Sequence, residues 1–306
     1  MERLSRITLA LLLTEGRFSC VKASQSLGLF SHDQLTRELA KEVVYTAVLT
    51  PLEALPKAGD LSVDDTVVAK PHANEIEGLE YTYSSSDNKV LLGLSVFLAV
   101  WRAEGKLYLV QVALPGERSK HELFQELLKQ LKVAGCEPKA VYFDNWYAAS
   151  DTLNLIHRLQ WVYVTRIKCN RVFGGAQVRK HKFFGASALV GRLKGVKHKV
   201  QVVKHGDRFL ATNGLVPHTT RSLARQYQNR WVIETVFRAL KSVLHLEKCA
   251  CRTLRAQFNH LLAAIHAFNF LSRTFPDLGP EIAQREFIRQ YRAGQIKPQE
   301  ILRQVA

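Results

Sequence analysis

The chain has 306 residues, with 43 Lys and Arg against 27 Asp and Glu, and a net charge of +16. Hydrophobic residues make up 47% and charged residues 23%, which is typical of a folded globular protein and excludes a largely disordered chain. The basic excess indicates a polyanionic partner, either nucleic acid or an anionic membrane.

Several function classes are excluded by what the sequence lacks. The five cysteines form no C-x-x-C pair, so neither a zinc ribbon nor a disulfide framework is indicated, and scattered thiols suit a reducing cytoplasm. No stretch approaches the ~18 apolar residues of a membrane span. No G-x-x-x-x-G-K-[ST] motif is present, so ATP is not implied.

The first 50 residues are expected to be helical. A helix over Val21–Leu27 would end at a glycine, and the Ser31 hydroxyl can cap a second helix over His32–Lys41. This pattern is typical of a helix-turn-helix, although an ordinary helical hairpin would give it too. Two prolines and a glycine in Pro51–Gly59 predict a linker. Residues 1–59 are therefore a helical N-terminal region and a candidate DNA-binding domain.

The segment that follows alternates apolar runs with amphipathic ones. The expected elements are three strands, a helix, a strand, a helix and a strand: Leu61–Val68, Val90–Trp101, Lys106–Leu114, Ser119–Ala134, Ala140–Phe143, Tyr147–Leu159 and Trp161–Lys168. This order is that of the ribonuclease-H-like fold, an α/β fold in which helices flank a mixed sheet. We predict that fold for residues 60–168 and 216–275.

Between these two segments, glycines punctuate short β-like pieces such as Val200–Val203 and Phe209–Ala211. Residues 169–215 are therefore predicted to be a β-rich insertion. Long helices are expected at Thr220–Leu246 and Leu254–Phe275, and residues 276–306 form a partly helical tail.

The positive charge is concentrated around this insertion. Residues 151–230 contain 16 Lys and Arg but 2 Asp and Glu. A block this uneven predicts a phosphate-binding surface, and a solvated basic face without a partner is the alternative. The expected DNA contacts of the insertion are Arg192, Lys194, Lys197 and Lys199.

Three acidic positions can meet in the predicted fold. Asp64 or Asp65 lies on the first strand, Asp144 ends the fourth, and Glu234 lies on the helix after the insertion. The first and fourth strands are neighbours in this fold. Three carboxylates at their ends can hold two hard divalent cations, Mg²⁺ or Mn²⁺, for in-line phosphoryl displacement.

The helix around Glu234 carries an unusual polar stripe. With Tyr227 set at zero and 100° per residue, Arg230, Glu234 and Lys241 all fall within a stripe of about 60°. A solvated, salt-bridged helix face would also place Arg230 and Glu234 four residues apart. The functional alternative is a metal-binding Glu flanked by phosphate-binding Tyr, Arg and Lys.

The spacing Tyr227-(2)-Arg230-(3)-Glu234-(6)-Lys241 resembles the YREK signature of bacterial insertion-sequence DDE transposases, specifically the insertion-sequence-4 family and its relatives. Asp64-Asp65-Thr66 and Phe143-Asp144-Asn145 resemble the two aspartate blocks of that family. The likeness runs from about Leu61 to Phe270. Like those transposases, the chain has a predicted β-rich insertion between the second Asp and the Glu.

The resemblance implies a role for each matching residue. Asp144 and Glu234 would be catalytic metal ligands together with the first aspartate, for which Asp64 fits the family pattern and Asp65 stays open. Tyr227, Arg230 and Lys241 would bind phosphates near the transposon end. Family members commonly act as dimers on double-stranded DNA, so a cytoplasmic, nucleoid-associated homodimer is implied.

Three functions are compatible with these residues. The first is a transposase that cleaves at element ends and joins the 3′-hydroxyl to target DNA. The second is a degenerate or domesticated relative that only binds DNA. The third is another ribonuclease-H-like nuclease, which would not account for the YREK stripe or the basic insertion.

Overall fold

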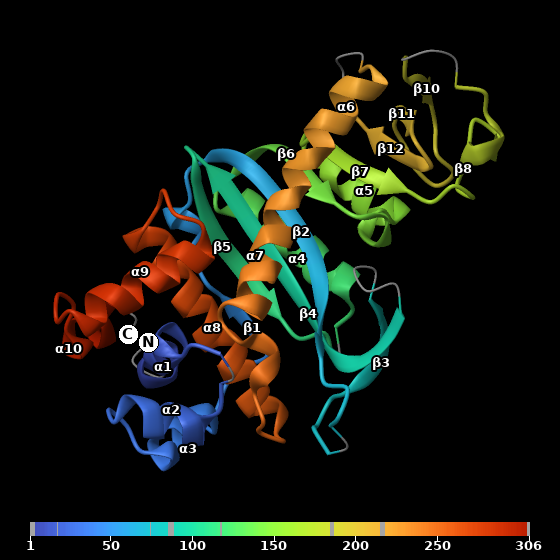
Figure 1. Cartoon of the computed structure of the whole chain (residues 1–306). Coiled ribbons are helices and arrows are strands. Elements are labelled where there is room, and N and C mark those ends of the chain that lie inside the picture. Colours follow the sequence, from blue (N-terminus) through green and yellow to red (C-terminus); the bar gives the residue numbers. More distant parts are fainter. Residues whose placement is uncertain are drawn as a thin grey trace. The chain divides into compact units, whose positions relative to one another are not determined.

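The computed structural model describes residues 4–16, 18–73, 75–84, 89–116, 118–183, 187–214 and 218–304 (Figure 1). The fold is mixed α/β, with a large mixed sheet and flanking helices. The chain divides into two compact units. Unit 1 comprises Met1–Tyr45, Thr66–Val96 and Thr235–Ala306, and unit 2 comprises Thr46–Asp65 and Phe97–Glu234.

The main sheet, most of which belongs to unit 2, has the strand order β1-β5-β4-β2-β6-β7-β12-β11-β10. Strands β2 and β6 are parallel, with Val63 opposite Phe143, and β6 and β7 are also parallel, with Phe143 opposite Thr165. Strand β6 therefore ends beside Val63 in the middle of β2, which continues to Ala69, and β7 ends two residues after its pairing with Phe143. The strand bounds are β1 Thr46–Val48, β2 Ala58–Ala69, β4 Lys89–Ala103, β5 Lys106–Ala113, β6 Glu137–Phe143, β7 Tyr163–Ile167, β10 Leu189–Gly191, β11 Val200–His205 and β12 Arg208–Thr212.

Helices cover both faces of this sheet. Helices α4 (Lys120–Val133) and α5 (Ser150–Arg158) share an apolar core with Phe143 and Val202. Helix α6 (Thr220–Tyr227) instead shares a core with the alternate strand residues, Tyr142 and Val203 among them. Because successive strand residues point to opposite faces, each strand residue is assigned to the α4–α5 face or to the α6 face.

Two short elements differ from the secondary structure expected at the end of the N-terminal region. Residues Thr46–Val48, expected to be helical, form β1, which pairs antiparallel with β5. The predicted linker Pro51–Gly59 contains a 3₁₀ turn at Leu52–Ala54 and the start of β2. A three-residue edge strand is stabilised by its pairing, which local sequence patterns do not reveal. Strand β3 (Glu80–Ser84), which pairs with β4, was not predicted either.

The long helix predicted over Thr220–Leu246 is interrupted, so that expectation is wrong. Helix α6 ends at Tyr227, a 3₁₀ turn covers Gln228–Arg230, and α7 runs from Trp231 to Ser242. Side chains of the turn bind other elements: Asn229 donates to the Tyr142 hydroxyl at 3.1 Å, and Arg230 pairs with Asp64. Such a turn in the middle of a helical segment often marks a functional position.

In unit 1, helix α1 (Ser5–Leu13) contacts α3, α8, α9 and α10, because it is apolar on every side. The predicted helix–glycine–helix is present, with Gly28 in the left-handed region (φ +63°) and a capping box at Ser31. A DNA-binding role for it stays a prediction. The remaining bounds are α2 Cys20–Leu27, α3 His32–Leu39, a 3₁₀ turn Leu246–Lys248, α8 Leu254–Thr274, α9 Pro280–Arg292 and α10 Pro298–Gln304. None of the helices described is both long and apolar enough to span a membrane.

The segment predicted as an insertion has two parts. Strands β8 (Val172–Phe173) and β9 (Ala176–Gln177) form a small separate sheet, followed by a 3₁₀ turn at Val178–Lys180. Strands β10, β11 and β12 continue the main sheet, since β12 pairs antiparallel with β7. Residues 184–186 and 215 of this segment lie outside the described residues. The predicted domain boundaries stay a prediction.

Candidate active site

Two aspartates follow directly on paired residues of the parallel strands. Asp64 follows Val63 of β2, and Asp144 follows Phe143 of β6, its partner in the register. Val63 and Phe143 both point into the core of the α4–α5 face. Alternation therefore directs Asp64 and Asp144 toward the α6 face. The structure thus brings these two predicted acids to neighbouring positions, Asp64 within β2 and Asp144 just after the end of β6.

Asp64 lies in a partly buried position, with 17% of its side chain exposed. Its carboxylate accepts from the Arg230 guanidinium and, at 3.0 Å, from the Asp65 backbone N–H. Burial raises the pKa of Asp64 to about 7; the Arg230 guanidinium opposes this shift, whereas the Asp65 and Asp144 carboxylates add to it. The site therefore concentrates negative charge where solvation is poor.

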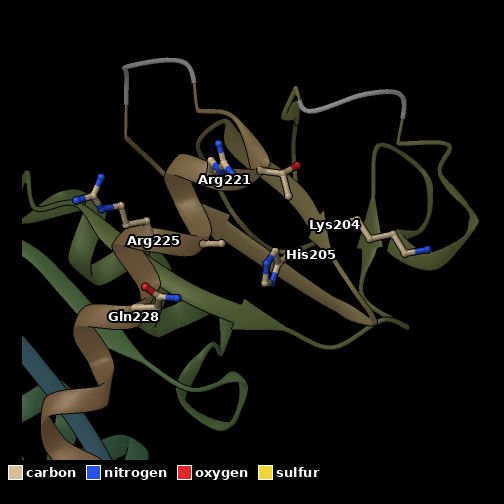
Figure 2. Close-up of a pocket in the computed structure, with 7 residues that line it drawn as sticks. Lys204, His205, Arg221, Arg225 and Gln228 are labelled. Atoms are coloured by element: carbon tan, nitrogen blue, oxygen red, sulfur yellow. The ribbon is translucent and has the colours of Figure 1, made fainter.

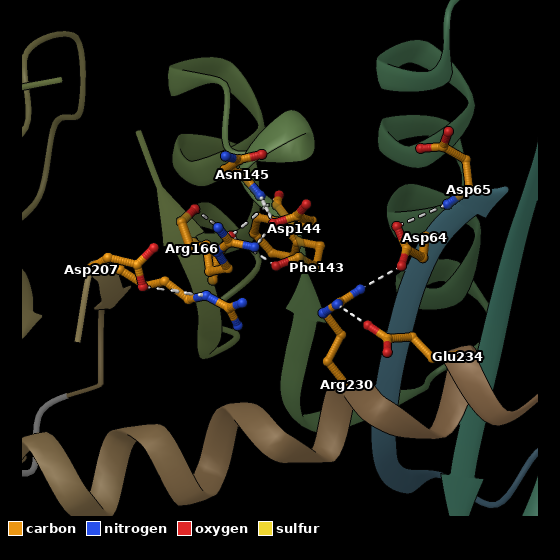
Figure 3. Close-up of polar contacts among 11 residues, drawn as sticks. Asp64, Asp65, Phe143, Asp144, Asn145, Arg166, Asp207, Arg230 and Glu234 are labelled. Atoms are coloured by element: carbon orange, nitrogen blue, oxygen red, sulfur yellow. Dashed lines mark hydrogen bonds and ion pairs between the residues drawn. The ribbon is translucent and has the colours of Figure 1, made fainter. Parts of the chain in front are cut away.

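Arg230 links two of the predicted acids. Its Nη1 binds Asp64 and its Nη2 binds Glu234, which is the first-turn acid of α7 (Figure 3). Although burial opposes the charge of the guanidinium, Asp64 and the other anionic groups raise the pKa of Arg230 further. Arg230 thus remains a cation and neutralises Asp64 and Glu234.

Tyr227 lies next to this ion-pair cluster at the end of α6. The Arg230 guanidinium carbon is 5.6 Å from the centre of the Tyr227 ring, a cation–π arrangement. The Tyr227 hydroxyl is buried and has no hydrogen-bond partner among the described residues. Burial raises the pKa of Tyr227 well above its ordinary value, so the hydroxyl remains a potential donor. An orphaned buried donor among carboxylates and guanidinium groups fits a site that binds an oxyanion.

Asp144 is positioned by its own backbone and by strand β7. Its Oδ1 accepts from the Asn145 N–H at 2.7 Å and caps the 3₁₀ turn Asn145–Tyr147. The Arg166 Nη1 lies 3.7 Å from the same oxygen (Figure 3). Arg166 was not assigned a role from the sequence. Its signal was an arginine within a predicted strand that follows the second aspartate.

Asp65, the alternative first aspartate, points to the other face. Its carboxylate accepts from the Lys120 Nζ at 2.5 Å and from the Tyr147 hydroxyl at 2.9 Å. Tyr147 is packed in the core shared with α4 and α5. The structure therefore groups Asp64, and not Asp65, with Arg230 and Glu234. Lys120 is a second residue that the sequence did not single out.

Lys241, the last residue of the predicted stripe, lies in unit 1. Its Nζ donates to the Val67 carbonyl at 2.8 Å and is 3.3 Å from the Glu247 carboxylate. The angles calculated for an uninterrupted helix do not apply from Tyr227 to Lys241, because the 3₁₀ turn lies between them. Of the stripe, the structure groups Tyr227, Arg230 and Glu234 within unit 2.

The four predicted DNA contacts of the insertion are exposed on the turn before β11: Arg192, Lys194, Lys197 and Lys199. This turn is attached to α5. Ser150 Oγ donates to the Lys194 carbonyl at 3.2 Å, and the Asn154 side chain bonds the Gly195 carbonyl and the Lys197 N–H. Its apolar residues Leu193 and Val196 belong to the core of the α4–α5 face. The turn is therefore not on the α6 face.

A divalent metal is implied by three converging acids, and the residues can be tested for it. In the ranges that the structure describes, no three His, Cys, Asp or Glu side chains are arranged as ready ligands of an ion. Arg230 instead neutralises two of the three acids. The donor chemistry nevertheless fits a hard divalent cation, because Asp64, Asp144 and Glu234 offer only carboxylate oxygens.

Comparison with known proteins gives one strong result. The transposase DDE domain family matches residues 56–270, well over half of the chain. A solved structure, the Drosophila P element transposase strand transfer complex, aligns at a TM-score of 0.30 and 16% identity. That alignment covers 93% of this chain and 63% of the Drosophila chain, so the protein spans less than two-thirds of the length of that chain. No curated protein matches. On the strength of the domain match, the chain belongs to the transposase DDE domain family.

Proposed function

We propose that the protein is a DNA transposase of the insertion-sequence-4 type, which cleaves DNA at element ends and joins the 3′-hydroxyl to target DNA. The observation that carries this proposal is the grouping of Asp64, Asp144 and Glu234 around Arg230. Arg230 joins Asp64 and Glu234, and Asp144 pairs with Arg166 on the neighbouring strand. The Tyr227 hydroxyl has no hydrogen-bond partner among the described residues. The match to the transposase DDE domain supports the same reaction class.

The sheet supports a ribonuclease-H-like core. Strands β5, β4, β2, β6 and β7 are neighbours in that order, with β4 and β5 antiparallel and β2, β6 and β7 parallel. This is the order expected for three antiparallel strands followed by two parallel ones. Residues 169–215 would then be an insertion whose last strands extend the sheet beyond β7.

Asp64, Asp144 and Glu234 would hold one or two divalent cations, Mg²⁺ or Mn²⁺. Such a cation, when bound, activates a water or hydroxyl and stabilises the leaving oxygen of a phosphoryl transfer. Because Arg230 binds Asp64 and Glu234, its guanidinium would have to exchange these partners for the phosphate of the DNA. Arginine is well suited to this exchange, since its planar fork binds phosphate as readily as carboxylate.

The remaining residues would position the DNA. The Tyr227 hydroxyl would donate to a phosphate oxygen, which would satisfy its missing hydrogen bond. Arg166, beside Asp144, would bind the same phosphate or its neighbour. Lys241 would bind a phosphate of the DNA backbone, as the resemblance to insertion-sequence transposases implies. A homodimer on double-stranded DNA remains the expected assembly.

The test first searches the DNA flanking the gene for short inverted repeats and then measures cleavage of a duplex that carries one. Glu234→Gln should reduce cleavage in Mg²⁺ by about 10³-fold or more, because a metal ligand is lost, and should leave DNA binding intact. Glu53→Gln is the matched control, since Glu53 is an exposed acid of the same unit and belongs to neither α6 nor the turn before β11. Cleavage by the Glu234→Gln protein would overturn the catalytic assignment. Binding without cleavage by the unmodified protein would favour a relative that only binds DNA.

A further inference from the structure

We propose that the outward side of α6, together with the β11–β12 hairpin, is the surface that holds the DNA backbone next to the active site. Figure 2 shows the groove, of about 780 Å³, between these elements. Lys204, His205, Arg221, Arg225 and Gln228 line it. A second groove of about 500 Å³ on α6 is also lined by Arg221 and Arg225. The two arginines therefore border both grooves.

The amphipathic pattern of α6 forces these arginines outward. Leu223 and Ala224 are buried against the sheet, in the core that includes Tyr142. Arg221 and Arg225, four residues apart, consequently lie exposed on the other side of the helix. Both side chains can therefore reach a ligand without any change in the packing of α6.

The cations that line the two grooves differ from Arg208, which pairs with Asp207 at 3.8 Å on the same hairpin. No acidic side chain lines either groove, and among the described residues no salt bridge involves Arg221, Arg225 or Lys204. Like charges four residues apart destabilise a helix by roughly 0.2–0.5 kcal/mol. A surface that keeps two such arginines beside a histidine is suited to a polyanion. Neutral amides and hydroxyls, which also bind phosphate oxygens, complete the lining.

The groove shares lining residues with a cavity beside Arg230 and Glu234. A smaller cavity of about 260 Å³ is lined by Arg208, Tyr227, Arg230 and Glu234, and it shares His205 and Gln228 with the α6 groove. Residues 221–234 are helical almost throughout. At 1.5 Å per residue, Arg221 and Glu234 therefore lie roughly 20 Å apart along the helical segment. At 3.4 Å per nucleotide of one strand, this distance corresponds to about six nucleotides.

The occupant that fits is double-stranded DNA, held through its phosphates. The distance of about six nucleotides from the cleaved phosphate rests on the proposed function. The binding of DNA to the α6 surface does not. The competing surface is the turn that contains Arg192, Lys194, Lys197 and Lys199, which belongs to the α4–α5 face. The two surfaces make opposite predictions for matched variants.

The experiment measures binding of a fluorescent 30-base-pair duplex without divalent metal, over a range of salt concentrations. Arg221→Gln/Arg225→Gln should lower the slope of log affinity against log salt by about two, one per lost phosphate contact. The control Arg192→Gln/Lys194→Gln removes the same charge and should leave the slope within half a unit of the unmodified protein. An unchanged slope in the α6 variant overturns the proposal, whatever the control does.

Two further measurements distinguish the loss of phosphate contacts from a loss of folding. Glutamine is a good helix former, so α6 should persist; each single substitution should lower the slope by about one even if the double variant is less stable. Neutral methylphosphonates five to seven nucleotides from the cleavage position should weaken binding of the unmodified protein but not of the double variant. Because salt slopes need no cleavage, an active Glu234→Gln protein would overturn the proposed function and leave the α6 surface standing.

Discussion

The two faces of the main sheet both carry polar groups, but these groups contact different partners. On the α6 face, Asp64 and Glu234 are joined by Arg230, and the exposed arginines of α6 lie a few turns earlier in the chain. On the α4–α5 face, Asp65 is bound by Lys120 and Tyr147, and a basic turn is attached to α5.

This difference shows that net charge does not by itself locate a binding surface. The turn has four exposed cations, at Arg192, Lys194, Lys197 and Lys199, whereas the outward side of α6 has two. The turn, however, is on the face from which the grouped acids are absent. The α6 arginines line a groove that shares residues with the cavity beside Glu234. The position of a cation relative to the grouped acids is therefore a better guide to DNA binding than the number of cations around it.

The largest expected effect separates the two aspartates. Asp64→Asn should reduce DNA cleavage by on the order of 10³-fold or more, because it removes a metal-binding oxygen anion. Asp65→Asn should reduce cleavage by less than about tenfold, since Asp65 only positions Lys120 and Tyr147. Single-turnover cleavage in Mg²⁺, with circular dichroism as the folding control, measures both. Equal losses would remove the distinction between the faces.

Much of this site could be predicted from the sequence. The apolar run before Asp144, the strand that carries Asp64, and the spacing of Tyr227, Arg230 and Glu234 are local patterns. Local patterns are what sequence periodicity reports. The choice between Asp64 and Asp65 could also have been made from alternation, since Val63 is apolar and Asp64 must point the other way.

Other features depend on contacts between distant segments and were missed. Strand β1 has three residues and exists because it pairs with β5. The pairing of β12 with β7, which extends the sheet, joins segments separated by some forty residues. The 3₁₀ turn at Gln228–Arg230 accompanies bonds from Asn229 and Arg230 to strands far away in sequence. No residue pattern within the helix itself encodes these partners.

A second prediction concerns His198, which anchors the basic turn in the α4–α5 core. Its ring stacks on His157 at 3.9 Å, and its Nε2 lies 3.0 Å from the Tyr163 hydroxyl. Burial, with a contribution from His157, lowers the pKa of His198 to about 4. Between pH 6.5 and 4 the unfolded chain therefore binds a proton that the folded chain does not. The free energy of unfolding should therefore decrease as the pH is lowered from 6.5 to 4, by at most about 3 kcal/mol.

Chemical denaturation at several pH values measures this loss. His198→Gln should remove a corresponding part of the slope between pH 6.5 and 4, whereas His205→Gln, on an exposed part of the β11–β12 hairpin, should retain it. A His198→Gln protein with the full acid slope would show that the turn is not anchored through this ring.

The smallest expected effect tests Tyr227 by opposite signs in stability and activity. Its hydroxyl is buried without a partner, so Tyr227→Phe should leave the free energy of unfolding unchanged or raise it by up to about 1 kcal/mol. If the hydroxyl donates to a DNA phosphate, the same change should slow cleavage by about tenfold. Tyr163→Phe is the control on the other face: it loses the bond to His198, so it should lower stability by about 1 kcal/mol and leave cleavage unaffected. A Tyr227→Phe protein that loses stability and keeps full activity would make Tyr227 a structural residue, and the α6 face would retain only its charged groups as candidates for DNA binding.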